Sequence, residues 1–279
     1  MYGCVCMKIG IVTGASSGLG EEAVVQISKL YKKLDEIWVV ARRTDRLEAL
    51  QNKVDKKLRV LSYDVTDAED IKKFKTLLEE LHPNIRILAN VAGFGKVGTF
   101  DEISYKDTVG MVQVNCTALV AITYLCLPYM KAKSRILQLA SAAAFLPQAG
   151  FAVYAATKSF VLSFARGLNM ELKDSGITVT AVCPGPVDTE FFDVAYSNPE
   201  DAQAFKKLFM VKKEAVIRKA LFDARDGKEV SVYGVPMKIL RTVSKVIPHS
   251  LILNGRRVAA KMNDSMEINT IVIRRGSFK

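Results

Sequence analysis

The middle of the chain contains side chains whose types and spacing suit proton transfer. Tyr154 and Lys158 are four residues apart, so on a helix they share one face, where the ammonium can stabilise a charged phenol. Ser141 lies thirteen residues before Tyr154 and can donate a hydrogen bond to an oxygen on which negative charge develops. Each residue type alone is common in structural roles. Their combination predicts acid–base catalysis, with Lys158 lowering the phenol pKa.

A glycine-rich turn, Thr13-Gly-Ala-Ser-Ser-Gly-Leu-Gly20, follows a strand-like segment and precedes apolar residues at helical spacing. Glycines let a backbone approach a pyrophosphate closely, and a helix N-terminus offers N–H groups and the positive end of its dipole. The serine hydroxyls can add donors and cap the helix. The candidate nucleotide contacts are Gly14, Ser16, Ser17, Gly18, Leu19 and Gly20. On its own the pattern also fits an ordinary β–α turn.

Two arginines, Arg42 and Arg43, end the second strand-like segment, about where an NAD site would place a carboxylate on the adenosine ribose. Guanidiniums in this position can pair with a 2′-phosphate through charge-assisted hydrogen bonds, so we expect the cofactor to be NADP(H). The alternative is that either arginine faces water.

A single fold must bring these residues together, and 279 residues, 49% of them apolar, suffice for one α/β domain. Short β-branched segments alternate with amphipathic helical ones. The expected strands are 8–12, 37–41, 58–63, 85–89, 135–139, 177–182 and 230–233. The alternation predicts a Rossmann-like doubly wound parallel sheet of about seven strands with helices on both faces. The ligand crevice then lies beyond the carboxyl ends of the strands.

We expect this domain at 8–235, with a possible N-terminal extension at 1–7 and a basic extension at 236–279 that packs on the domain or on a neighbouring subunit. The net charge of +11 lies entirely in residues 206–279, which carry 17 basic and 6 acidic groups. Such a region can be a solvated face, or it can meet an anionic substrate, an acidic carrier protein or a membrane surface. We expect a solvated face, because runs of charge usually have no further role. Membrane contact is less favoured, and no motif supports nucleic-acid binding.

Several motifs resemble, in order and spacing, those of the short-chain dehydrogenase/reductase family from residue 8 to about 233. They are Thr13-Gly-x-x-x-Gly-x-Gly20, Asp64-Val65, Asn90-Val-Ala-Gly93, Asn115, Ser141, Tyr154-x-x-x-Lys158 and Pro184-Gly-Pro-Val-Asp-Thr189. The family often has two adjacent asparagines before Ala92, where this chain has Asn90 and Val91. This departure affects only hydrogen bonding around the adenosine.

The resemblance implies roles for the residues that match these motifs. Asp64 and Val65 would contact the adenine, although Asp64 can instead cap a helix that begins near Thr66. The expected contacts to the adenosine ribose are Asn90, Ala92 and Gly93. The expected contacts to the nicotinamide are Pro184, Gly185, Val187 and Thr189.

The resemblance also completes the catalytic group as Asn115, Ser141, Tyr154 and Lys158. It implies that Lys158 binds the nicotinamide ribose, that the positive nicotinamide helps to lower the pKa of Tyr154, and that Asn115 holds a water in a proton relay. It further implies homodimers or homotetramers built on the helices near 109–130 and 151–173.

Substrate contacts in this family come from loops after the fourth, fifth and sixth strands. In this chain those loops contain Phe94, Phe145, Leu146, Phe191 and Phe192. Together with Ser141 they suit an apolar carbonyl or alcohol. We expect 188–211 to close over the site as a substrate lid. The lysines near its end, Lys206, Lys207, Lys212 and Lys213, could attract an anionic tail of the substrate.

The segment 109–130 contains no charged residue and is long enough to span a membrane, but its polar residues favour a helix buried against the sheet. Five cysteines without a C-x-x-C pair and only two histidines predict neither a disulfide framework nor a metal site. Cys116 and Cys126 would fill space as small apolar residues. Without a secretory pattern near the N-terminus, we expect a cytoplasmic protein.

The residues and the resemblance together predict an NADPH-dependent carbonyl reductase or alcohol dehydrogenase in which Tyr154 is the general acid and base. The sequence leaves 3-oxoacyl groups and the ring ketones of steroids or bile acids open as substrates. An alternative is a non-catalytic NADP(H) sensor that acts through a partner protein.

Overall fold

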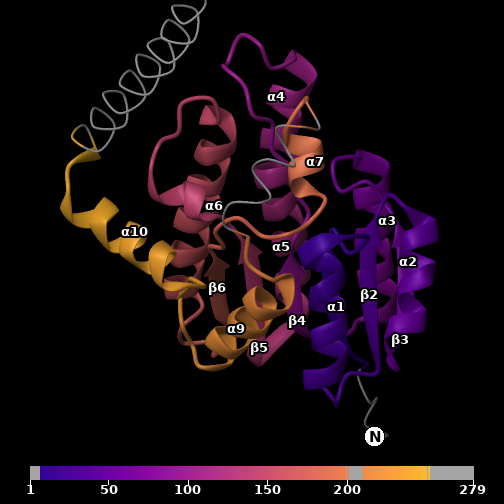
Figure 1. The fold of residues 1–279 in the computed structure, drawn as a ribbon. Helices are drawn as coiled ribbons and strands as arrows, with labels where there is room; N and C mark the ends of the chain where they lie inside the picture. Colours follow the sequence, from indigo (N-terminus) through magenta and orange to yellow (C-terminus); the bar gives the residue numbers. More distant parts are fainter. Residues whose placement is uncertain (1–6, 199, 201–209, 250, 252–279) are drawn as a thin grey trace, which may run out of the picture.

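The protein, described here from a computed structural model of residues 7–198, 200, 210–249 and 251, is built around a seven-stranded parallel sheet (Figure 1). The strand order is β3-β2-β1-β4-β5-β6-β7, so the order reverses between β1 and β4. The strands are β1 (Lys8–Thr13), β2 (Glu36–Ala41), β3 (Lys57–Ser62), β4 (Asn84–Asn90), β5 (Met130–Leu139), β6 (Thr178–Val182) and β7 (Val230–Ser231). This confirms the predicted fold class.

Helices cover both faces of the sheet, as its two apolar surfaces require. One face packs against α1 (Gly18–Leu30), α2 (Thr44–Leu50) and α9 (Lys213–Arg225). The other packs against α3 (Ala68–Leu81), α5 (Leu119–Cys126) and α6 (Ala152–Glu171). The remaining described helices are η1 (Gln51–Lys53), α4 (Tyr105–Val112), η2 (Gln113–Ala118), η3 (Leu127–Tyr129), η4 (Ala142–Phe145), α7 (Phe191–Ala195) and α10 (Val235–Val246).

Each predicted strand is present within one or two residues at its ends, except that β5 begins five residues earlier than expected, at Met130. Three of the five added residues, Lys131, Lys133 and Ser134, are polar and were therefore not expected in a buried sheet. Lys133 adopts a left-handed conformation with φ of 70°. The Ser134 hydroxyl donates to the Ile85 carbonyl at 2.8 Å and accepts from the Lys131 amide at 3.2 Å. One side chain therefore supplies the hydrogen bonds that the irregular backbone lacks.

The predicted apolar helix is present over 105–129 but is not continuous, because a π-helical segment, η2, separates α4 from α5. By length and hydropathy, residues 105–129 could cross a membrane. In this structure their buried side joins the core, with Met111, Leu119, Ile122 and Cys126 as its most enclosed apolar residues. The π-helical segment carries Asn115 and so bears directly on the site.

A buried polar cluster fixes α5 to the end of the sheet that carries the site. The Thr123 hydroxyl accepts hydrogen bonds from the amides of Asn90 and Gln138, both at 2.9 Å, and donates to the Leu119 carbonyl at 2.7 Å. Asn90 lies on β4 and Gln138 on β5. All three polar side chains are almost fully enclosed, so each hydrogen bond is costly to break.

Parts of the predicted organisation lie outside the described residues, namely 1–6, most of the segment 199–209, and 250 with 252–279. The described part of the C-terminal region, α10, packs on the domain through Met237 and Leu240.

We predict that Thr123→Val lowers the free energy of unfolding by about 2 kcal/mol, because the amide of Gln138 loses its acceptor in a dry environment. Chemical denaturation measures this change. Thr242→Val is the matched control, since Thr242 makes the same type of bond to the carbonyl four residues earlier but is exposed. Equal, small effects of the two substitutions would contradict the proposed importance of the cluster.

Candidate active site

The predicted site residues gather at the carboxyl ends of the central strands. The glycine turn follows β1, Ala92 and Gly93 follow β4, and Ser141 follows β5. Because the strand order reverses between β1 and β4, the loops there diverge and form a crevice.

The glycine turn is compact enough that two of its glycines cannot be replaced without movement. A Cβ atom on Gly20 would lie 2.1 Å from the Gly14 carbonyl oxygen, and one on Gly14 would lie 2.7 Å from Ala92. Gly14 also has a positive φ of 68°. The Thr13 hydroxyl accepts from the amides of Val91 at 3.1 Å and Ala92 at 3.3 Å, so the turn is fastened to the β4 loop. The N–H groups at the start of α1 face this crevice end, which fits a pyrophosphate.

Arg43 rests on the glycine turn. Its guanidinium donates to Ser17 at 2.9 Å and to Ser16 at 3.1 Å. It also pairs with Glu190 at 3.2 Å, and Glu190 is bound by Arg46 of α2 at 2.6 Å. Ser17 occupies the N-cap position of α1, but its side chain makes no capping bond and bonds Arg43 instead.

Arg42 points to the other side of the turn, where it pairs with Asp64 at 3.7 Å and is 78% exposed. Asp64 also accepts from the amide and hydroxyl of Thr66, at 2.9 and 2.7 Å. The helix that follows is capped by Asp67, which accepts from the amides of Glu69 and Asp70. The alternative that Asp64 is the helix cap is therefore wrong, and one Asp64 oxygen remains on the side of Arg42.

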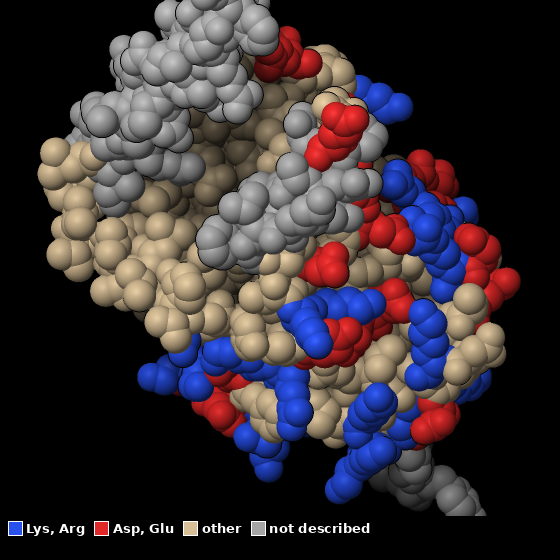
Figure 2. All heavy atoms as spheres, viewed as in Figure 1, with Lys and Arg blue, Asp and Glu red and all other residues tan. Residues whose placement is uncertain are grey.

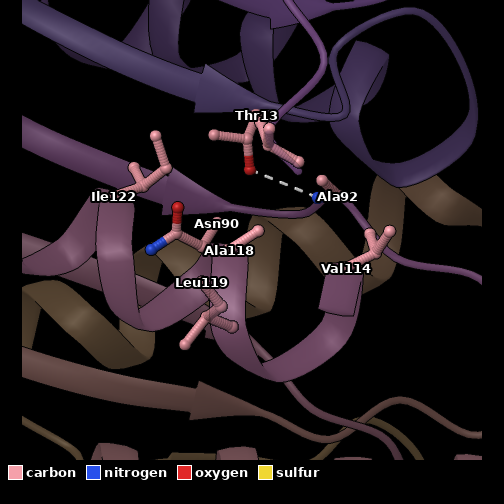
Figure 3. A pocket seen from close by; sticks show the side chains of 8 residues that line it. Thr13, Asn90, Ala92, Val114, Ala118, Leu119 and Ile122 are labelled. Atoms are coloured by element: carbon pink, nitrogen blue, oxygen red, sulfur yellow. Dashed lines mark hydrogen bonds between the residues drawn. The ribbon is translucent and has the colours of Figure 1, made fainter. Parts of the chain in front are cut away.

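The structure corrects the role expected for Asn90. Its side chain is only 2% exposed, and its amide donates to Thr123 and to Gln138. Figure 3 shows it among the side chains of α5, around a cavity of about 10 Å³. A space of that size is comparable to one water molecule and is far too small for a ribose. Asn90 therefore fastens strands and helix together, because the last strand residue points into the core and only the backbone after it reaches the crevice.

Tyr154 lies in the first turn of α6 inside a small aromatic cluster. Its ring stacks on Phe151 with 4.2 Å between centroids and lies 5.4 Å from Phe191 of α7. Phe94 packs on the same cluster. Gly95 is required here, since a Cβ atom on it would lie 2.8 Å from the Tyr154 ring. Tyr154 is 7% exposed, so it is in contact mainly with apolar groups.

This environment opposes the expected lowering of the phenol pKa. Burial raises the pKa of Tyr154 to about 12, and a hydrogen bond with Ser141 only partly opposes the increase. Loss of hydration costs the phenolate more than the neighbouring groups return. The lowering expected from Lys158 together with the positive nicotinamide stays a prediction.

Lys158 is buried on the same face of α6, with its ammonium 5.6 Å from the Tyr154 ring centroid. The ammonium donates to the Leu139 carbonyl at 2.8 Å. Burial lowers the pKa of Lys158 to about 8, although the nearby thiols of Cys116 and Cys183 oppose this. The amine is therefore mostly protonated at neutral pH and remains the positive charge nearest the phenol ring among the interactions that the structure describes.

Asn115, on the π-helical segment, connects three parts of the site. Its carbonyl accepts from the Phe94 amide at 3.1 Å, and its amide donates to the Phe94 carbonyl at 2.9 Å and to the Thr157 hydroxyl at 3.0 Å. Thr157 in turn donates to the Tyr154 carbonyl at 2.7 Å. The side chain of Asn115 thus bonds protein groups and helps to position Tyr154. The expected water of a proton relay stays a prediction.

The segment after β6 approaches the site from the other side. Thr189 contacts the glycine turn at Gly18, and Gly185 touches Met237 of α10. The α10 helix therefore supports the loop that contains Pro184 and Val187.

The predicted substrate phenylalanines divide into two groups. Phe94 and Phe191 lie in the cluster around Tyr154, and Phe192 packs against Phe191 with 5.3 Å between centroids. Phe145 is different: it is buried in the main core, as is Leu146 beside it. The tight turn of η4 directs Ala143 toward Tyr154 and Phe145 away from it, which corrects the expected contact with substrate.

Four residues of the site were not expected from the sequence. Arg46 could have been found, because it lies three residues after Arg43 and so shares its side of α2. Phe151 and Thr157 flank the Tyr154 motif without a signal of their own. Glu190 has no sequence signal, because its partners are about 145 residues earlier.

Charges near the site are mixed in sign. In Figure 2 the surface over α1 and α2 shows basic and acidic groups side by side, whereas the surface over α10 is mostly uncharged. In the described part of the basic region, Lys213 pairs with Glu21, and Lys219 and Lys228 both pair with Asp223. These pairs account for part of the positive charge, and Lys206 and Lys207 lie outside the described residues.

Comparison with known proteins gives consistent matches. A family model described as short chain dehydrogenase matches residues 8–200. Serine 3-dehydrogenase of Agrobacterium fabrum is 34% identical over 198 residues, which cover 69% of this chain and 77% of that protein. The NADP-dependent 3-hydroxy acid dehydrogenase of Schizosaccharomyces pombe is 32% identical, with 68% and 75% covered. A solved short-chain dehydrogenase from Sphingobium yanoikuyae in complex with NADPH is 25% identical, with a TM-score of 0.71 over 92% of this chain and 96% of that one.

The buried amine gives a testable dependence of stability on pH. Lys158 has a pKa of about 8 when folded against an ordinary 10.5, so between these values the unfolded chain binds more protons and stability rises with pH. We predict that the free energy of unfolding of the wild type, relative to Lys158→Met, increases by about 2 kcal/mol from pH 8 to about pH 10. Denaturant titrations at several pH values measure this. Parallel curves for the two proteins would show that the amine is not buried.

Proposed function

The chain belongs to the short-chain dehydrogenase/reductase family, and from this premise we propose that it is an NADPH-dependent carbonyl reductase with Tyr154 as general acid and base. The observation that carries the proposal is the grouping of Ser141, Tyr154 and Lys158 at the carboxyl end of the sheet. Ser141 lowers the pKa of the Tyr154 phenol, and the ammonium of Lys158 lies 5.6 Å from the centre of the phenol ring. This is the arrangement that proton donation to a substrate oxygen requires.

NADP(H) is the cofactor that the charges favour. The glycine turn and the start of α1 fit a pyrophosphate. Beyond the end of β2, where the 2′-phosphate of the adenosine ribose would lie, there are three guanidiniums, those of Arg42, Arg43 and Arg46. The relative from Schizosaccharomyces pombe is named NADP-dependent, and the Sphingobium structure contains NADPH. When bound, the nicotinamide would supply or accept the hydride. Asp64, Val65, Ala92, Gly93 and the loop 184–189 are the further residues proposed to hold the cofactor.

In the direction of reduction, Tyr154 is the proton donor. A phenol with a pKa of about 12 is protonated at neutral pH, so Tyr154 is ready to donate a proton to a carbonyl oxygen. Ser141 can donate a second hydrogen bond to the same oxygen as its charge increases. Lys158 then stabilises the phenolate that remains. Asn115 and Thr157 keep Tyr154 in place through its backbone carbonyl.

The substrate we propose is a 3-oxoacyl compound or another apolar ketone. The aromatic side chains of Phe94, Phe151 and Phe191 around Tyr154 suit an apolar body next to the carbonyl. Two relatives act, by their names, on serine and on 3-hydroxy acids, and serine is itself a 3-hydroxy acid. These names support the 3-oxoacyl class.

We further propose that the protein is a homodimer or homotetramer built on α5 and α6. Large apolar side chains on these helices and next to them are exposed, namely Val112, Tyr124, Phe160 and Met170. Association would remove them from water. Size-exclusion chromatography with light scattering tests this, and a monomer at micromolar concentration contradicts it.

We predict that Tyr154→Phe lowers kcat for ketone reduction about 10²- to 10⁴-fold, because the proton donor is lost while the ring still packs. The loss of NADPH absorbance with a panel of 3-oxoacyl esters and ring ketones measures the rate. Tyr124→Phe, on the exposed side of α5, is the control and should react like the wild type. If Tyr154→Phe retained full activity, this mechanism would be excluded. Tight NADPH binding without turnover of any substrate would instead support a redox sensor.

We predict that Arg43→Ala weakens NADPH binding roughly 10- to 100-fold and changes NADH binding little, since a hydrogen bond to a charged group is worth more than a neutral one. Calorimetric titration with each cofactor measures the two dissociation constants. Arg218→Ala, on α9, serves as the control. The same loss for both cofactors would refute recognition of the 2′-phosphate by Arg43.

A further inference from the structure

Three consecutive residues after β6 contact three different parts of the cofactor crevice. The first, Thr189, lies against the glycine turn: a Cβ atom on Gly18 would be only 3.2 Å from Cβ and Cγ2 of Thr189. The loop after β6 and the turn after β1 therefore touch at the point where the turn would face a pyrophosphate.

The second residue, Glu190, places a carboxylate between two guanidiniums. One oxygen is 2.6 Å from Nη1 of Arg46, and the other is 2.9 Å from the same nitrogen and 3.2 Å from Nη1 of Arg43. The hydrogen bond from Arg46, and then that from Arg43, hold the pKa of Glu190 below its ordinary value, so it is an anion at neutral pH. The other two nitrogens of the Arg43 guanidinium, Nε and Nη2, donate hydrogen bonds to the hydroxyls of Ser16 and Ser17.

The third residue, Phe191, covers Tyr154. Its ring lies 5.4 Å from the Tyr154 ring, which has Phe151 stacked on it at 4.2 Å. Thr189, Glu190 and Phe191, which we call the plug segment, thus contact the phosphate turn, the arginines and the catalytic phenol in turn.

We propose that Glu190 is an internal competitor for the 2′-phosphate of the cofactor, so that it sets how strongly the protein selects NADP(H) over NAD(H). The inference rests on the proposed cofactor. A carboxylate and a phosphate are both anionic acceptors that use the same guanidinium donors, and two anions on the same pair repel each other. A 2′-phosphate must therefore displace Glu190 from Arg43 before it can use that guanidinium fully.

The ion pairs that Glu190 of the plug segment makes are weak enough for a ligand to break. Arg43, Arg46 and Glu190 are each between 41 and 49% exposed, so water screens their attraction. An exposed ion pair of this type changes an equilibrium constant by only about one- to fivefold. A phosphate monoester carries up to about two charges and three acceptor oxygens, so it outcompetes one carboxylate. A ligand without this phosphate does not compete with Glu190 and leaves the pair intact.

The experiment is a calorimetric titration of the full-length protein with adenosine 2′,5′-bisphosphate and with adenosine 5′-monophosphate. Glu190→Gln keeps the shape of the side chain and removes its charge. We expect the variant to bind the bisphosphate about two- to fivefold more tightly than the wild type does, with unchanged affinity for the monophosphate. Glu229→Gln is the matched control: Glu229 also pairs with an arginine, Arg166 at 3.3 Å, with similar exposure, and should alter neither affinity.

Unchanged or weaker binding of the bisphosphate by Glu190→Gln would overturn the inference, because Glu190 would then only orient the arginines. A double variant gives an independent check. In an Arg43→Ala background, Glu190→Gln should produce a much smaller gain, since the contested guanidinium is missing. The wild type alone tests the cofactor proposal: if it binds both nucleotides equally well, the NADP(H) preference fails whatever the variant does.

Discussion

The strongest physical demand in this structure is the presence of a buried ammonium next to a buried phenol. An amine taken out of water must keep a hydrogen-bond acceptor, and Lys158 obtains it from the Leu139 carbonyl at the end of β5. The carboxyl end of a strand therefore fixes the amine, and the first turn of α6 fixes the phenol. The position of α6 on the sheet cannot shift without separating one group from its support.

The remaining polar contacts transmit this positioning to neighbouring elements. Asn115 interrupts a long apolar helix with a π-helical segment, and its side chain then holds the β4 loop and α6 together. The second cluster, around Thr123, joins α5 to β4 and β5 one layer deeper. The two clusters together connect the β4 loop, η2, α5 and α6 with strands β4 and β5. Among the described residues, Asn90 Oδ1 is a buried polar atom that stays unpaired.

The fold could be predicted from the sequence because buried parallel strands are almost continuously apolar, and each such segment is recognisable locally. The early start of β5 could not be predicted. Its polar residues join the sheet because the Ser134 hydroxyl bonds the Ile85 carbonyl and because Lys133 adopts a left-handed conformation. The same division applies to the site. Motif spacing identified Ser141, Tyr154 and Lys158. It could not show that the side chains of Asn90 and Phe145 point into the core, because that direction depends on the local backbone conformation of each residue. Spacing reports the charge of Lys158 beside Tyr154, but not the loss of water that raises the pKa of the phenol.

The contact between Gly185 and Met237 links the nicotinamide loop to a helix more than fifty residues later in the chain. A Cβ atom at position 185 would lie 2.8 Å from the sulfur of Met237, so a larger residue at 185 requires the Met237 side chain to move or to be shorter. During divergence, an alanine or serine at 185 would therefore be accepted most easily alongside a shorter residue at 237. The pair should vary jointly among descendants of the same ancestor, and α10 should be inherited together with the loop that it supports.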